Sequence, residues 1–143
     1  MNISFRNAKI EDKDFILEAN KEINLLSGLN DSTLDNNIDK DLFEDKICKV
    51  IIAEINNNAA GFILYFYIYW ANRGKGIYLS QAYVKSEYRK QGILKMLLNK
   101  LEEREKNCNF ITNLVGNEND VMMKSLQKLN FKSSDLITYY KLK

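Results

Sequence analysis

The sequence contains no histidine, an absence that removes the commonest general base and the commonest metal ligand of proteins. It has only two cysteines, Cys48 and Cys108, which are too few for a zinc site or a disulfide framework. A reducing, cytoplasmic location is therefore expected, and no bound metal. A catalytic thiol needs an activating base, so the lack of histidine also argues against a cysteine nucleophile.

Long hydrophobic runs are missing as well. The most apolar stretch, "FILYFYIYW" (62–70), is less than half the length of a membrane-spanning helix, which needs about 20 residues. The N-terminal stretch lacks the apolar centre of a signal peptide. Lys and Arg number 21 against 19 Asp and Glu, so the charge balance does not favour nucleic acid or an anionic membrane as a partner. A chain of 143 residues with 45% hydrophobic residues is expected to form one soluble domain, residues 1–143.

Hydrophobic periodicity and turn-forming residues divide the chain into strands and helices. The predicted strands are 2–8, 48–55, 59–70, 77–84, 110–116 and 130–142. The predicted helices are 10–27, 38–45, 92–105 and 118–129. The order β-α-α-β-β-β-α-β-α-β joins an antiparallel meander to a β-α-β unit. It predicts an α/β (α+β) fold, a mixed, mostly antiparallel twisted sheet flanked by helices.

The stretch "YVKSEYRKQGILKMLL" (83–98) passes from a predicted strand into a predicted helix. The first amide N–H groups of a helix have no internal partners, and with the helix dipole they form a natural anion site. Gly92 permits a positive φ or a close backbone approach, and Arg89, Lys90 and Lys95 add positive charge. The stretch can hold a diphosphate, although taken alone it is more simply a helix start with a solvated basic face.

This stretch also resembles the central motif of the GNAT acetyltransferase superfamily, in which Arg/Gln-x-x-Gly-x-Gly/Ala follows the fourth strand. Arg89 and Gly92 match the motif, and Leu94 stands where glycine or alanine is usual. "AAGFILYFYIYW" resembles the third strand of the family, and "NENDVMMKSLQKLNFK" resembles its closing helix, with Asn119 and Phe131 retained. The middle third of the chain is most similar to polyamine and diamine N-acetyltransferases of the spermidine/spermine type.

The resemblance implies acetyl-CoA as cosubstrate, bound in a wedge between residues 77–84 and 110–116. It implies that backbone groups of 82–84 pair with the pantetheine arm and that backbone N–H groups of 90–95 hold the pyrophosphate. Asn119 would contact the pantetheine or help to orient it. The implied cofactor-binding residues are Ala82, Tyr83, Val84, Arg89, Lys90, Gln91, Gly92, Ile93, Leu94, Lys95 and Asn119. Simpler alternatives are a core position for Tyr83 and Val84 and a helix cap for Asn119.

The implied reaction is transfer of an acetyl group to a primary amine of a small molecule (polyamine, diamine or amino-acid-like) by direct attack in a ternary complex. The glutamate base of the polyamine-acetylating relatives corresponds to Ser80, and their general-acid tyrosine corresponds to Leu126. Ser80 and Tyr83 are therefore the catalytic candidates, and other groups that could act are Tyr69, Glu118 and Tyr139. The alternative function is a catalytically weak CoA-binding sensor or partner-binding domain.

Two further patterns bear on the acceptor. Tyr65, Tyr67 and Tyr69 alternate onto one face of a strand, where they could line an acceptor pocket, pack in the core or form a dimer interface. A homodimer is expected from the resemblance. Where the polyamine relatives carry acidic residues after the first helix, this chain has 26–28, "LSG"; nearby Asp31 and Asp35 fit turn or capping roles.

Overall fold

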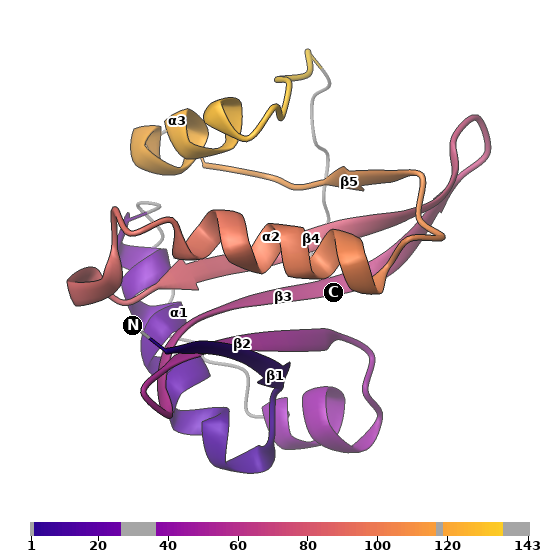
Figure 1. Ribbon diagram of the computed structural model, residues 1–143. Coiled ribbons are helices and arrows are strands. Elements are labelled where there is room, and N and C mark those ends of the chain that lie inside the picture. Colours follow the sequence, from indigo (N-terminus) through magenta and orange to yellow (C-terminus); the bar gives the residue numbers. More distant parts are fainter. Residues whose placement is uncertain (1, 27–36, 117–118, 136–143) are drawn as a thin grey trace.

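The structure is a computed structural model that describes residues 2–26, 37–116 and 119–135. These residues form a 5-stranded sheet in the order β1-β2-β3-β4-β5. The first four strands pair antiparallel and β5 pairs parallel to β4, which confirms the predicted mixed, mostly antiparallel sheet (Figure 1). The strands are β1 Ile3–Asn7, β2 Lys49–Ile55, β3 Asn58–Trp70, β4 Gly74–Val84 and β5 Phe110–Thr112.

Helices cover both faces of the sheet. The α-helices are α1 Lys13–Leu26, α2 Ile93–Arg104 and α3 Asp120–Lys128. Three shorter helical segments are the 3₁₀ turns η1 Ile10–Asp12 and η3 Ser86–Tyr88 and the π-helical segment η2 Asp39–Glu44. In Figure 1, α2 crosses in front of the sheet, α1 lies on the opposite side, and α3 stands beyond β5. The predicted helix 38–45 is thus present as η2.

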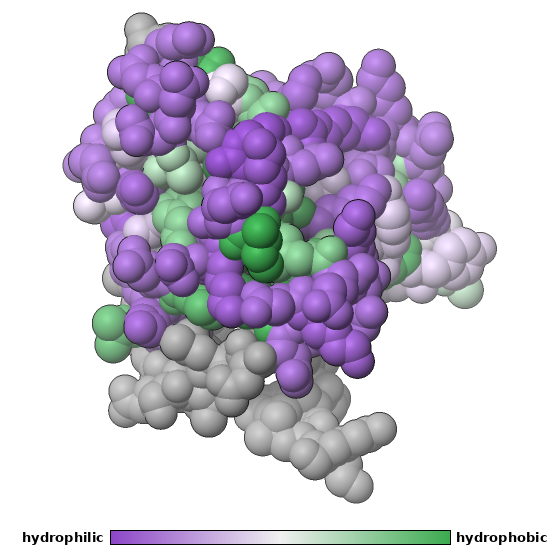
Figure 2. Space-filling model, turned by 90° about the horizontal axis from the view of Figure 1, so that it is seen from below, coloured by the Kyte–Doolittle hydropathy of each residue, from purple (hydrophilic) through white to green (hydrophobic). Residues whose placement is uncertain are grey.

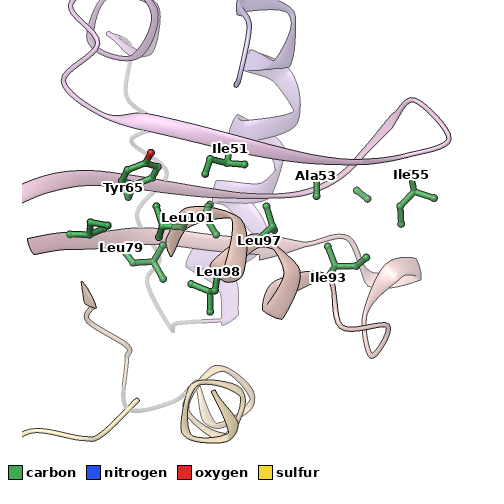
Figure 3. Close-up of a cluster of buried hydrophobic side chains, with 12 residues drawn as sticks. Ile51, Ala53, Ile55, Tyr65, Leu79, Ile93, Leu97, Leu98 and Leu101 are labelled. Atoms are coloured by element: carbon green, nitrogen blue, oxygen red, sulfur yellow. The ribbon is translucent and has the colours of Figure 1, made fainter. Parts of the chain in front are cut away.

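Two apolar clusters, one on each face, hold the helices to the sheet. The leucine stripe of α2 buries Leu97, Leu98 and Leu101 against Ile51 and Leu79 (Figure 3). On the other face, Ile16 and Ala19 of α1 pack with Phe62 and Leu64 of β3, and Ile38 beside η2 belongs to the same cluster. Figure 2, which views the molecule from the side of η2 and the start of α1, shows a mostly hydrophilic surface with small apolar areas.

A β-bulge at Ser80 reverses the side-chain pattern of β4. Leu64 pairs with Gln81 and Tyr65 pairs with Leu79, so Ser80 is the extra residue on the bulged strand. Leu79 before the bulge packs in the α2-side cluster, and Ala82 beyond it packs there too, which a regular period of two would forbid. The bulge therefore sets which residues at the end of β4 face α1.

Strands β4 and β5 run together only at one end of the sheet. β5 pairs with Gly76–Tyr78, and β4 continues to Val84 beyond this short ladder. The ring of Phe110 lies directly on Gly76, where a Cβ atom would come within 2.3 Å of it, and contacts the Trp70 ring at a centroid distance of 4.6 Å. The predicted strand 110–116 is therefore too long, because close packing fixes only its first part against β4.

Only the first part of the predicted C-terminal strand 130–142 lies within the residues that the structure describes. Residues 131–135 are described and are not in a strand, while 136–142 lie outside the described residues. Across the described ranges, no helix combines the length and apolar character that a membrane crossing requires, and no acidic, cysteine and histidine side chains gather as a metal-binding group.

Candidate cofactor and acceptor site

The turn between β4 and α2 has the backbone geometry of an anion site. Lys90 and Gly92 both have positive φ angles, 62° and 80°, and Gly92 is the N-cap of α2. The N–H of Met96 donates to the Gly92 carbonyl at 3.1 Å, so the N–H groups of residues 93–95 have no acceptor within the helix. Left-handed residues in such a turn create a concave set of N–H groups that suits a phosphate.

The side chain of Arg89 braces this turn instead of facing its mouth. Its Nε donates to the Val84 carbonyl at 2.8 Å, and its Nη2 forms an ion pair with Glu22 of α1. Arg89 is thus engaged by Val84 and Glu22, and its predicted contribution of positive charge to the phosphate site stays a prediction. Lys90 and Lys95 are exposed and remain the basic side chains next to the turn.

Tyr83 is joined to the same glutamate. Its hydroxyl donates to Glu22 Oε2 at 2.6 Å, and its ring packs against Phe15 and Phe62 on the α1 side of the sheet. Burial, together with the hydrogen bond to Glu22, raises the pKa of Tyr83 to about 12. Hydrogen bonds from Tyr83 and then Arg89 lower the pKa of Glu22. These bonds commit Tyr83 to a structural contact and argue against the predicted catalytic role.

Ser80 occupies the bulge on the exposed side of β4. The extra residue of a bulge is left out of the ladder, and bulges are frequent beside active sites for this reason. A serine hydroxyl offers hydrogen bonds but, unlike the glutamate of the polyamine relatives, no carboxylate that could remove a proton at neutral pH. Ser80 therefore stays a candidate for positioning the reacting groups.

Asn119 is the N-cap of α3. Its Oδ1 accepts a hydrogen bond from the Met122 N–H at 3.1 Å, as the helix-cap alternative predicts, and its Nδ2 could still donate to a cofactor. Leu126, at the position of the family's acid tyrosine, is buried, with 5% of its surface exposed. Glu118, Tyr139, Asp31 and Asp35 lie outside the described residues.

The three alternating tyrosines lie on the α2 side of the sheet. The hydroxyls of Tyr65 and Tyr67 both donate to Glu105 beyond the end of α2, at 2.8 and 2.7 Å. The Tyr67 ring contacts the ammonium groups of Lys49 and Lys75, while Tyr69 is 75% exposed. Because Tyr65 and Tyr67 are tied to Glu105, they fit a structural role better than an acceptor pocket.

A cleft of about 830 Å³ lies at the opposite end of α2 from Gly92. Arg104 and Glu105 border it on one side and Leu42 and Phe43 on the other, and Cys48 lies in its wall. Burial, and secondarily the charge of Asp41, raises the pKa of the Cys48 thiol, which disfavours the thiolate form. This cleft is separate from the phosphate-type turn.

Two buried amide oxygens were missed by sequence reasoning. The Oε1 of Gln81 and the Oδ1 of Asn20 are buried, and neither has a hydrogen-bond partner in the part of the chain that the structure describes. Gln81 directly follows the bulge residue Ser80. The sequence did contain a signal for Gln81. The triplet "LSQ" (79–81) aligns with the "Leu-Glu-Asp" of the polyamine relatives, so Gln81 stands where those relatives carry the aspartate.

Solved structures of several acetyltransferases share this fold. A possible acetyltransferase from Clostridium difficile 630 has a TM-score of 0.78 and 24% identity, and the alignment covers 99% of each chain. The aminoglycoside N-acetyltransferase AAC(6')-Iy, in complex with a CoA-containing bisubstrate analogue, has a TM-score of 0.79 and 16% identity over 100% of this chain and 99% of that one. A ribosomal-protein-alanine N-acetyltransferase from Brucella melitensis biovar Abortus 2308 has a TM-score of 0.75 and 14% identity over 99% of each chain.

The family assignment comes from the sequence itself. The model of the Acetyltransferase (GNAT) family matches residues 14–131, a span that contains α1 from its second residue on, the phosphate-type turn, the β4–β5 pair and α3. Enzymes of this family are N-acetyltransferases that use acetyl-CoA, so the predicted enzyme class and cosubstrate are confirmed. The match does not single out the polyamine type. The chain belongs to the acetyltransferase (GNAT) family.

Proposed function

We propose that this acetyltransferase acetylates a primary amine of a small molecule, of polyamine, diamine or amino-acid-like type, by direct attack in a ternary complex. The observation that supports the proposal most is that the bulge at Ser80, the part of β4 beyond its pairing with β5, and the turn at residues 90–95 follow one another along the chain. At one end of this segment, the turn offers backbone N–H donors for a diphosphate. At its other end, the bulge at Ser80 interrupts the regular pairing of β4 with β3.

The residues fit acetyl-CoA in three places. Backbone N–H groups at the start of α2 would hold the pyrophosphate, with Lys90 and Lys95 beside it. Among the described residues, β5 pairs with β4 only as far as Tyr78, so the edge of residues 82–84 offers backbone groups to the pantetheine amides. The irregular backbone at Ser80 would then lie near the thioester.

In the proposed reaction, the protein itself positions the amine against the thioester and supplies backbone hydrogen-bond donors. Acetyl-CoA supplies the thioester, whose C–S bond breaks as the amine forms the new C–N bond, with the amine proton released and the thiol protonated. Backbone N–H groups beside the bulge would stabilise the negative charge that develops on the carbonyl oxygen. Since Ser80 brings no carboxylate and Tyr83 is bonded to Glu22, the amine proton leaves through water, and proximity supplies much of the rate.

Titration calorimetry with acetyl-CoA and CoA, followed by a thiol-release assay with a panel of amines, tests the proposal. We expect binding well below millimolar concentration and turnover with at least one primary amine. Binding without turnover on any amine would favour the second candidate, a CoA-binding sensor, which the missing carboxylate at Ser80 and missing hydroxyl at Leu126 also support. No binding of either nucleotide would contradict both functions.

We propose further that residues 1–143 form a single domain and that the protein is a cytoplasmic homodimer. Both cysteines are free thiols, as a reducing compartment requires, and Tyr69 offers an exposed aromatic ring on β3. Light scattering is expected to give twice the chain mass of 16.7 kDa. A monomer mass would contradict the dimer, and a Tyr69→Ser variant would show whether β3 forms the interface.

A further inference from the structure

The polar network around Glu105 forms part of the cleft at the end of α2. The Glu105 carboxylate accepts hydrogen bonds from Tyr65 at 2.8 Å and from Tyr67 at 2.7 Å, and it pairs with Lys49 at 3.1 Å. Burial raises the pKa of Glu105, but hydrogen bonds from the two tyrosines and from Lys49 outweigh it and hold the pKa below its ordinary value. Both oxygens of this carboxylate are therefore engaged within the protein.

The same cleft, of about 830 Å³, carries an excess of positive charge. Three cationic side chains line it: Lys46, Lys49 and Arg104. Among the described residues that line it, Glu105 is the single carboxylate, so three cations against one anion give a net charge of +2. Asp41 acts on the Cys48 thiol but is not one of the lining residues. A concave surface with such an excess attracts an anion.

Two of these cations, Lys46 and Arg104, form no ion pair with any residue in 2–26, 37–116 and 119–135. Arg104 Nη1 donates to Asn7 Oδ1 at 2.7 Å, which holds the guanidinium beside β1 and leaves most of its five N–H donors available. Lys46 has a positive φ of 53°, and strained backbone of this kind recurs at ligand-binding sites. Both cations are thus placed to bind an anion in the cleft.

Apolar side chains form another wall of the cleft. Leu42 and Phe43 of η2 are half-buried, and Ile10 is half-exposed. The segment η2 is π-helical, since the Asp45 N–H donates to the Lys40 carbonyl, five residues earlier, at 2.7 Å. Such helices are rare and occur frequently at functional sites. Figure 2 views this side of the molecule and shows apolar areas bordered by hydrophilic residues.

We propose that this cleft is a second ligand site, which binds a small monocarboxylate with an apolar chain or ring independently of acetyl-CoA. The planar guanidinium of Arg104 matches the two oxygens of a carboxylate, and Lys46 adds a second cation. The apolar part of the ligand packs against Leu42 and Phe43. The cleft volume lies within the range of about 300–1,000 Å³ that is typical of small-molecule sites.

Titration calorimetry with octanoate, in the absence and presence of saturating CoA, tests the proposal. Octanoate is expected to bind with a Kd below about 1 mM, and CoA should leave this Kd unchanged because Gly92 lies at the other end of α2. Octylamine and octan-1-ol keep the chain but reverse or remove the charge, whereas acetate keeps the charge without the chain. Each is expected to bind more weakly than octanoate by about tenfold or more.

Paired variants locate the site. Arg104→Gln and Lys46→Gln are each expected to raise the Kd for octanoate by about fivefold. Arg73→Gln and Lys128→Gln remove the same charges at exposed positions that do not line the cleft, and they should leave the Kd unchanged. Thermal unfolding would verify that all four variants remain folded.

Three results would overturn the inference. Octanoate that binds no better than octylamine or octan-1-ol would show that charge does not select the ligand. Unchanged octanoate affinity in both Arg104→Gln and Lys46→Gln would show that the ligand binds elsewhere. Displacement of octanoate by CoA would place it in the cofactor site, whereas additive binding of the two supports a separate cleft.

Discussion

Replacing Gly92 with valine is expected to weaken acetyl-CoA binding by about tenfold or more, with little change in the fold. Gly92 has a φ angle of +80°, and a residue with a side chain pays about 1–2 kcal/mol to adopt this left-handed conformation. Space is not the obstacle, since a Cβ atom at this position would meet only the Met96 methyl group, at 3.8 Å. A valine would relieve the strain by changing φ, which would turn the N–H groups of the phosphate-type turn out of alignment.

Gly92→Asn is the matched control, because asparagine tolerates the left-handed region far better than a β-branched residue does. Calorimetry should therefore show a much smaller loss of affinity for Gly92→Asn than for Gly92→Val. Thermal unfolding of both variants would verify that the α2 region remains folded. Equal affinity of wild type and Gly92→Val for acetyl-CoA would show that the turn does not hold the diphosphate.

The elements that the sequence predicted well are those with a local signal. The stripe of Leu94, Leu97, Leu98 and Leu101 marks α2 because each residue has its neighbour within one or two turns. Gly92 also marks the start of that helix through a local requirement. The turn needs a positive φ at this position, and glycine adopts a positive φ without strain. This is why the phosphate-type half of the site could be predicted from one short stretch.

The acceptor half depends on contacts between residues far apart in sequence. Arg89 and Tyr83 both meet Glu22, which belongs to a different helix, and no local pattern connects them. The bulge at Ser80 shifts every later side chain of β4 to the other face, so a regular alternation misplaces Gln81. The sequence showed that Tyr65 and Tyr67 share a face, but only the packing of α2 decides which face it is.

Replacing Arg6 with alanine is expected to destabilise the fold by about 3 kcal/mol at neutral pH, because it leaves the Asp12 carboxylate buried without its cation. Arg6 donates two hydrogen bonds to Asp12, at 2.6 and 2.9 Å, and its Nε donates to Glu54 at 2.6 Å. This network ties β1 and β2 to the start of α1. The side chain of Asp12 is only 8% exposed, whereas that of Arg6 is 29% exposed. Because Arg6 is partly open to solvent, we expect a loss of stability at the lower end of the range typical of broken buried ion pairs.

Asp12→Asn tests the same network through its pH dependence. Burial raises the pKa of Asp12, but hydrogen bonds from Arg6 and from the Lys9 N–H outweigh it, so the pKa lies below its ordinary value of 3.8. A carboxyl with a lowered folded-state pKa contributes stability above its unfolded pKa and loses it as pH falls through the folded value. The difference in unfolding free energy between wild type and Asp12→Asn should therefore be large at pH 7 and shrink below about pH 4.

Urea unfolding at pH 7 and at pH 3 measures this difference, with Asp14→Asn as the control. Asp14 lies in the first turn of α1 but is exposed, so its substitution should change stability little at either pH. If the Asp12→Asn deficit is the same at both pH values, its cause is lost packing and not the charged pair. A deficit that shrinks on acidification shows that the ionised Asp12–Arg6 pair is what fastens the first helix to the sheet, the helix whose Glu22 accepts the hydrogen bond from Tyr83 of β4.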